Sequence, residues 1–137
     1  MGDRANVLVR CVDEQVCLYT HWGGSELPKI LQHALKRGIR RWHDFPYLAR
    51  IIFSEMIKDD IMDEAGYGIS QRVGDGESRV LTVSVPSQII TNPGGHYMSF
   101  QDYVNCEDIS WHYETKKAPP VYKAEPASTL TRKILMK

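Results

Sequence analysis

Two runs of strand-forming residues stand near the start of the chain: Val7-Leu8-Val9-Arg10-Cys11-Val12 and Gln15-Val16-Cys17-Leu18-Tyr19-Thr20-His21-Trp22. Both runs are rich in β-branched and aromatic side chains, which favour strands. Only Asp13-Glu14 separates them, and so short a polar connection predicts an antiparallel hairpin. We therefore expect a fold organised around a sheet that begins with this hairpin.

Two helices are expected after Gly23-Gly24 breaks the second strand. The first has Ser25 as its expected N-cap and Gly38 just beyond its end. The second is expected to begin at Asp44 and to continue through 47–57, where apolar residues cover most of the helix circumference. The first helix carries one apolar stripe at helical spacing: Leu27, Ile30, Leu31, Ala34 and Leu35.

The second half of the chain predicts three more strands, at 67–73, 79–85 and 88–91, separated by turns rich in glycine and proline. Ser99 is expected to cap a short helix at 100–104. The order of elements is therefore β-β-α-α-β-β-β. Such an order predicts an α+β fold, with an antiparallel sheet of about five strands and two helices packed on one face.

The composition indicates an ordinary globular domain. The chain has 137 residues, 42% of them hydrophobic, and its 17 basic and 17 acidic residues give a formal net charge of zero. Because a neutral chain has no dominant basic surface, a nucleic-acid partner is not expected. No apolar run approaches the roughly 20 residues that span a bilayer, so no membrane association is expected either.

Cysteine content and the chain ends bear on compartment and domain organisation. Three cysteines, and a first segment that leads into a strand without a secretory signal, predict a reducing, cytoplasmic setting. Residues 1–105 are expected to form a single α+β domain. Residues 106–137 show no apolar period, which predicts an extended or disordered C-terminal tail.

Four segments resemble a family of short hypothetical proteins from bacteria and their phages: Met1-Gly2-Asp3-Arg4-Ala5-Asn6, Leu18-Tyr19-Thr20-His21-Trp22-Gly23-Gly24, Tyr47-Leu48-Ala49-Arg50-Ile51-Ile52-Phe53 and Gly66-Tyr67-Gly68-Ile69-Ser70. The resemblance extends from the start of the chain to about the fifth expected strand, at 88–91, and does not include the tail. It implies a prokaryotic or phage origin, and hence the cytoplasm. It implies no particular activity and supplies no catalytic residues.

The most distinctive candidate site is the turn Tyr19-Thr20-His21-Trp22-Gly23-Gly24-Ser25, which connects a strand end to a helix start. Helix N-termini expose N–H groups and the positive end of the helix dipole, which suit anions. Two glycines let a ligand approach the backbone, while His21 offers a hydrogen bond and Trp22 a stacking face. In the purely structural alternative Trp22 packs in the core and His21 lies on the surface. The exposure of Trp22 therefore distinguishes the two interpretations.

Arg50 is a second candidate, because it is a lone cation on an otherwise apolar helix. An arginine in such a position either binds an anion or pairs with a carboxylate of its own chain. The carboxylates considered as partners are Asp3, Asp44 and Glu55.

Tyr67 is a third candidate, since Gly66 and Gly68 on either side permit a ligand-facing tyrosine or a β-bulge. An acidic connector, 58–64, precedes it. The five histidines and three cysteines show no zinc-site spacing, so neither a metal nor a cofactor is expected.

Three functions follow as hypotheses. The first is a non-catalytic binding protein that holds a small anionic ligand, such as a nucleotide, or a protein partner at the Tyr19–Ser25 turn, with Arg50 and Tyr67 nearby. The second is a small hydrolase or transferase of phosphate-containing substrates, with His21 as general acid or base. The third is an interaction module that works through its tail. The oligomeric state, including a homo-oligomer, is left open.

Overall fold

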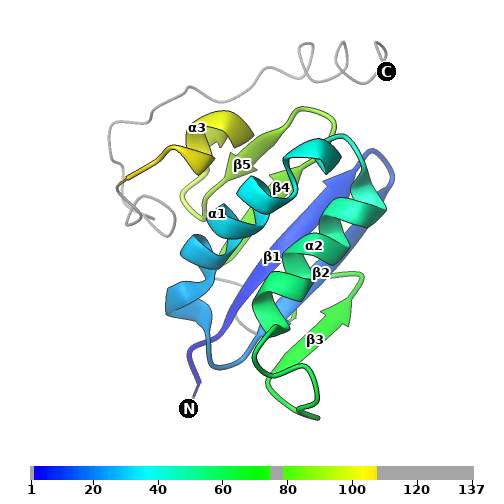
Figure 1. Ribbon diagram of the computed structural model, residues 1–137, viewed down its shortest axis with the longest axis vertical. Helices are drawn as coiled ribbons and strands as arrows, with labels where there is room; N and C mark the ends of the chain where they lie inside the picture. Colours follow the sequence, from blue (N-terminus) through cyan, green and yellow to red (C-terminus); the bar gives the residue numbers. More distant parts are fainter. Residues whose placement is uncertain (1, 75–78, 108–137) are drawn as a thin grey trace.

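The computed structural model describes residues 2–74 and 79–107, so the predicted tail lies outside the described residues from 108 onward. The described elements form two layers, a sheet and a layer of helices on one of its faces (Figure 1). The predicted α+β class is confirmed.

The hairpin forms as the strand pattern predicts. Strand β1 (Ala5–Cys11) pairs antiparallel with β2 (Glu14–Thr20), with Ala5 opposite Thr20 and Cys11 opposite Glu14. The turn is one residue earlier than expected, at Val12-Asp13, because Glu14 already belongs to the ladder. Val12 adopts a positive φ of 47°, the backbone twist that tight hairpin turns require.

The sheet corrects the sequence-based topology. Within the described residues it has six strands in the order β3-β2-β1-β4-β5-β6, and it is mixed, because β1 pairs parallel with β4 (Val80–Ser84). The two long helices join the antiparallel neighbours β2 and β3, since Thr20 and Tyr67 are register partners. The connection between Ser70 and Val80 leads from β3, at the edge of the sheet, to β4 on the far side of β1. The other strands are β3 (Tyr67–Ser70), β5 (Ile89–Thr91) and β6 (Tyr97–Ser99), and the last was not predicted.

The helices largely follow their predicted boundaries. They are α1 (Leu27–Arg37), α2 (Phe45–Ile57) and α3 (Phe100–Val104). Ser25 does not cap α1: a 3-10 turn, η1 (Gly24–Glu26), comes first, and Glu26 precedes the helix without a side-chain cap. A second 3-10 turn, η2 (Ile39–Arg41), follows α1. Asp44 caps α2 by accepting a hydrogen bond from Tyr47 N, and Ser99 caps α3 by accepting one from Asp102 N.

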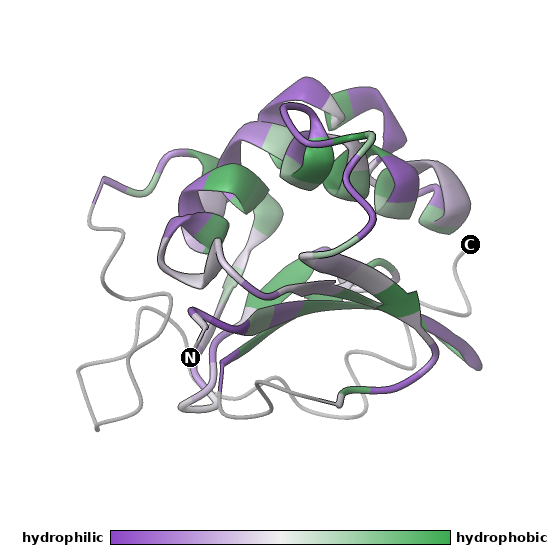
Figure 2. Cartoon of the chain, turned by 90° about the horizontal axis from the view of Figure 1, so that it is seen from below, coloured by the Kyte–Doolittle hydropathy of each residue, from purple (hydrophilic) through white to green (hydrophobic). Residues whose placement is uncertain are grey.

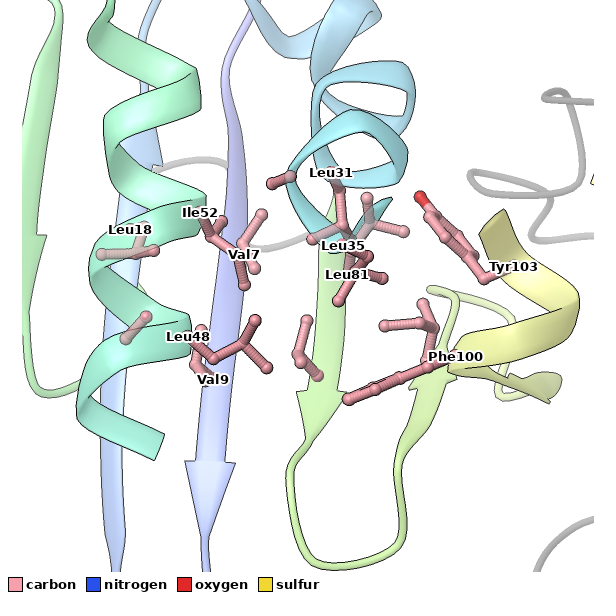
Figure 3. Close-up of a cluster of buried hydrophobic side chains, with 14 of the residues drawn as sticks. Val7, Val9, Leu18, Leu31, Leu35, Leu48, Ile52, Leu81, Phe100 and Tyr103 are labelled. Atoms are coloured by element: carbon pink, nitrogen blue, oxygen red, sulfur yellow. The ribbon is translucent and has the colours of Figure 1, made fainter. Parts of the chain in front are cut away.

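The core lies between the helices and one sheet face. Figure 2 shows the hydrophobic sides of the helices turned toward the sheet, as expected for amphipathic helices. Figure 3 shows the contact, to which β1, β2 and β4 contribute Val7, Val9, Leu18 and Leu81, and the helices contribute Leu31, Leu35, Leu48, Ile52, Phe100 and Tyr103. All of these side chains are buried.

Candidate functional site

The end of β2 and the start of β3 meet at one corner of the fold. His21 N donates to Gly66 O at 2.8 Å, which extends the β2–β3 ladder by one residue pair beyond Thr20 and Tyr67. Gly66 has a φ of 99°, in the left-handed region that favours glycine. The predicted candidates of the β2 end are therefore brought beside Tyr67.

Tyr19, His21 and Trp22 form a continuous aromatic cluster at this corner. The Tyr19 hydroxyl lies 2.7 Å from His21 Nδ1, and the ring centroids of His21 and Trp22 are 4.2 Å apart in an edge-to-face arrangement. Trp22 is 63% exposed, so it is not the core residue that the purely structural alternative required. A large aromatic ring held outside the core by its neighbours is typical of a binding surface.

An open hollow lies beside the exposed indole. It has a volume of about 380 Å³ and is lined by Trp22, Asp60, Asp63, Glu64, Ala65 and Tyr67. These residues come from the end of β2, from the loop that follows α2 and from the start of β3. We call it the acidic hollow, because three of its six lining residues are carboxylates and none of the six is basic.

Tyr67 forms one wall of the acidic hollow as a neutral hydrogen-bond donor. Its hydroxyl donates to Asp60 Oδ2 at 2.8 Å. Burial, followed by the hydrogen bond to Asp60 and the surrounding acidic charge, raises the pKa of Tyr67 to about 12. Around neutral pH the hollow therefore carries the negative charge of Asp60, Asp63 and Glu64 with no phenolate.

The helix start that was expected to bind an anion holds a carboxylate of the chain itself. Ser25 N donates to Asp3 Oδ2 at 2.8 Å, and Gly24 N donates to the Asp3 backbone oxygen at 2.7 Å. Arg79 forms an ion pair with the same carboxylate. The hydrogen bonds from Arg79 and Ser25 lower the pKa of Asp3 to about 2.

Gly24 is required for this arrangement, since a Cβ there would lie 2.4 Å from the Asp3 backbone oxygen. The backbone of the Gly23-Gly24-Ser25 turn thus approaches another backbone closely, as two glycines allow. The approaching group is the N-terminal segment at Asp3.

Arg50 is not brought to this corner. It is exposed on α2, where its guanidinium carbon lies 5.9 Å from the centroid of the Tyr47 ring. At about 1.5 Å of helix per residue, Arg50 is roughly 10 Å from the end of α2 at Ile57. The carboxylates considered as its partners pair with other basic residues: Asp3 with Arg79, Asp44 with Arg41, and Glu55 with Arg37 and Lys58.

The carboxylates of the acidic hollow were seen in the sequence only as a charged connector. Asp60, Asp63 and Glu64 have no regular spacing, and nothing in a loop sequence says which way its side chains point. The available signal was the proximity of three acids to the candidate Tyr67 along the chain. These acids indicate a binding site only once the β2–β3 pairing is known, because that pairing brings Trp22 beside them from a distant segment.

A second, smaller hollow lies on the sheet face opposite the helices. It has a volume of about 200 Å³ and is lined by Asn6, Tyr19, Gly68, Ile69, Ser70 and Gly74. Near it, the Cys17 thiol donates to Asn6 Oδ1 at 3.2 Å, and burial raises the pKa of Cys17. Tyr19 thus borders this hollow while Trp22 borders the acidic one.

Two kinds of feature are absent from the described part of the chain. Within residues 2–74 and 79–107, no three or more His, Cys, Asp or Glu side chains are grouped so as to hold a metal ion. None of the described helices has the length and apolar character needed to cross a membrane. Comparison with protein-family models, curated proteins and solved structures finds no match for this chain.

Proposed function

We propose that this protein is a non-catalytic binding protein whose acidic hollow takes a lysine or arginine side chain of a protein partner. The observation that carries the proposal is the exposed indole of Trp22 beside three carboxylates. This choice takes the protein-partner branch of the first sequence-based hypothesis. It differs from the small-anion branch in the charge of the group that is bound.

The chemistry of the hollow suits a cation. A guanidinium or ammonium group is attracted to the face of an aromatic ring and forms charge-assisted hydrogen bonds with carboxylates. Trp22 supplies the ring, while Asp63 and Glu64 are exposed and able to turn toward a ligand. An anion would instead be repelled by Asp60, Asp63 and Glu64.

The surface around the hollow suits a protein better than a small molecule. Seven large hydrophobic residues of the described chain are exposed, and four of them belong to the segments that form or adjoin the hollow: Trp22, Ile61, Met62 and Ile69. Met62 is 89% exposed in the loop that supplies the carboxylates. Exposed apolar side chains beside complementary charge are typical of a protein–protein interface.

The small-anion and enzyme hypotheses stay as alternatives with their own sites. An anion would have to compete with the Asp3 carboxylate for the N–H group of Ser25. An acid–base role for His21 would use an imidazole whose Nδ1 already contacts the Tyr19 hydroxyl. Both therefore require a rearrangement of existing contacts, whereas the acidic hollow is open.

The test is an NMR titration of ¹⁵N-labelled protein with N-acetyl-arginine amide, and separately with ATP. The indole Nε1–H signal of Trp22, assigned from its loss in Trp22→Phe, is the readout. We expect it to shift with the arginine amide at a dissociation constant on the order of millimolar, as befits one ion-pair and cation–π contact.

Charge-matched variants locate the effect. Asp63→Asn with Glu64→Gln should weaken arginine binding by about fivefold or more, since two exposed ion-pair contacts are removed. Asp13→Asn with Glu14→Gln changes the net charge equally at the opposite end of β2 and should leave binding unchanged. Shifts with ATP at His21 and Ser25, together with none for the arginine amide, would favour the anion hypothesis instead.

A further inference from the structure

We infer that the partner segment binds in extended form as a seventh strand on the free edge of β3, antiparallel to it, with its basic side chain in the acidic hollow. The inference rests on the proposed function and adds the backbone conformation and sequence pattern of the partner. Two observations support it. Successive residues of β3 direct their backbone N–H and C=O groups alternately toward β2 and toward the open edge. Tyr67 belongs both to β3 and to the lining of the acidic hollow.

Strand β3 ends the sheet on one side. Among residues 2–74 and 79–107 its hydrogen-bonded neighbour is β2, and the strand order gives it none on the other side (Figure 1). In Figure 1, β3 lies at the outer margin of the sheet, beyond α2. An edge strand presents unpaired backbone donors and acceptors that can pair with another chain.

The ladder between β2 and β3 determines which backbone groups face outward. Because His21 N donates directly to its register partner Gly66, this is a hydrogen-bonded pair of an antiparallel ladder. Such pairs alternate with non-hydrogen-bonded ones, so Gly68 is bonded to β2 whereas Tyr67 and Ile69 are not. Tyr67 and Ile69 therefore each point one N–H and one C=O toward the open edge.

Of the features that usually prevent strand addition, this edge has a short length of four residues but lacks proline, charge and a bulge. Proteins protect edges with proline, with charged side chains or with bulges. The four residues of β3, Tyr-Gly-Ile-Ser, include no charge and no proline, and their ladder with β2 runs without interruption. Ile69 is 62% exposed, so an apolar side chain already stands beside the outward-facing backbone groups.

The side-chain direction connects this edge to the acidic hollow. Tyr67 and Ile69 point to the helix side of the sheet, because they lie opposite Thr20 and Leu18, which face the core. In an added strand, the residue opposite Tyr67 has its Cβ about 5 Å away on the same side, within reach of the hollow for a long basic side chain. The residue opposite Ile69 points the same way and packs on that isoleucine.

These positions predict a sequence pattern for the partner. In the antiparallel orientation, which pairs slightly more stably per residue than the parallel one, the residue opposite Ile69 precedes the residue opposite Tyr67. The segment therefore reads apolar, any residue, then Lys or Arg. A suitable probe is the peptide acetyl-Thr-Ile-Thr-Arg-Thr-amide, with its isoleucine for Ile69 and its arginine for the hollow.

Backbone methylation of this peptide tests the pairing by NMR titration. N-methylation of the peptide's isoleucine or arginine removes an N–H that faces β3 and should weaken binding by about fivefold or more. N-methylation of the threonine between them alters an N–H that points away and should change affinity less than twofold. Equal weakening by all three methylations would overturn strand addition.

The protein offers a matched variant. Ile69→Pro removes an N–H group that faces the open edge and does not bond β2. An edge strand tolerates proline at such a position, so we expect the hydrogen bonds between β2 and β3 to remain. We expect Ile69→Pro to bind the peptide at least tenfold more weakly than Ile69→Val, while N-acetyl-arginine amide still shifts the Trp22 signal in both. If N-acetyl-arginine amide does not shift the Trp22 signal of the unmodified protein, that result would contradict the proposed function itself.

The thermal melting of both variants shows whether they fold. If Ile69→Pro is unfolded, the methylated peptides decide the question on the unmodified protein. Native mass spectrometry tests a second copy as the occupant. A dimer that Ile69→Pro abolishes, in a protein to which the peptide does not bind, would place another β3 on this edge and would overturn the proposal.

Discussion

The indole of Trp22 lies directly against Gly66. A Cβ built on Gly66 would be 3.1 Å from Trp22 Cδ1, closer than most Cβ contacts in proteins. Gly66 also has a φ of 99°, which a residue with a side chain rarely adopts. The exposed ring at the candidate site is thus positioned by a glycine 44 residues away in the sequence.

Gly66→Ala is expected to lower the free energy of unfolding by about 1–2 kcal/mol, because it combines backbone strain with a close contact to the indole. It should also displace Trp22 and change its indole Nε1–H chemical shift. Chemical denaturation and NMR measure the two effects. Gly74→Ala is the control, since nothing lies within 4 Å of a Cβ there. Equal stability of the two variants would contradict the contact.

Asp3→Asn is expected to lower stability near neutral pH by about 1 kcal/mol or less, as for exposed ion pairs. The pKa of Asp3 falls from its ordinary 3.8 to about 2 in the folded state. A carboxyl with a depressed folded-state pKa stabilises the fold fully above its ordinary value, and this contribution is lost as the pH falls toward 2. The stability difference between the two proteins should therefore shrink from pH 4 to pH 2.

Urea denaturation at intervals across this range measures the difference. Glu14→Gln is a suitable control, because Glu14 is exposed at the hairpin turn. A difference between wild type and Asp3→Asn that stays constant down to pH 2 would show that the Asp3 carboxylate is not held by Ser25 N and Arg79.

Trp22→Ala is expected to abolish the shifts that N-acetyl-arginine amide causes in the backbone amide signals of Asp63 and Glu64, which remain observable when the indole is removed. It should lower the unfolding free energy by less than about 1 kcal/mol, because a largely exposed side chain contributes little burial. Trp22→Phe should retain weaker binding, since a phenyl ring also attracts cations. Leu48→Ala supplies the contrast: Leu48 is fully buried, and its truncation should cost about 2–5 kcal/mol. A comparable loss of stability in Trp22→Ala would indicate a structural indole.

Cys17 is expected to react with iodoacetamide far more slowly than Cys11 and Cys106 in the folded protein. Cys17 is buried, and that burial raises its pKa, whereas the other two cysteines are partly exposed. Since the thiolate is the reacting form, both effects slow alkylation. Peptide mapping by mass spectrometry gives the three rates. The reference is the protein unfolded in urea, where the three cysteines should be alkylated at equal rates. Similar alkylation rates in the native protein would show that Cys17 is readily exposed by opening of the fold.

Local patterns of the chain determined the hairpin, the two long helices and the caps at Asp44 and Ser99. Each depends on residues within a few positions of one another: strand-forming runs around a short turn, apolar residues at helical spacing, and side chains that bond a backbone N–H three residues on. The same reasoning located Trp22 and Tyr67 as candidates, from the glycines beside them.

Tertiary structure alone decided the rest, because those features depend on pairs of distant residues. The parallel β1–β4 pairing joins Val7 to Leu81 across most of the described chain, and β6 is defined by its pairing with β5. Asp3 reaches Ser25 and Arg79 only in the folded chain. Likewise, the acidic hollow exists only because β3 pairs with β2 and so places the carboxylates of the preceding loop beside Trp22.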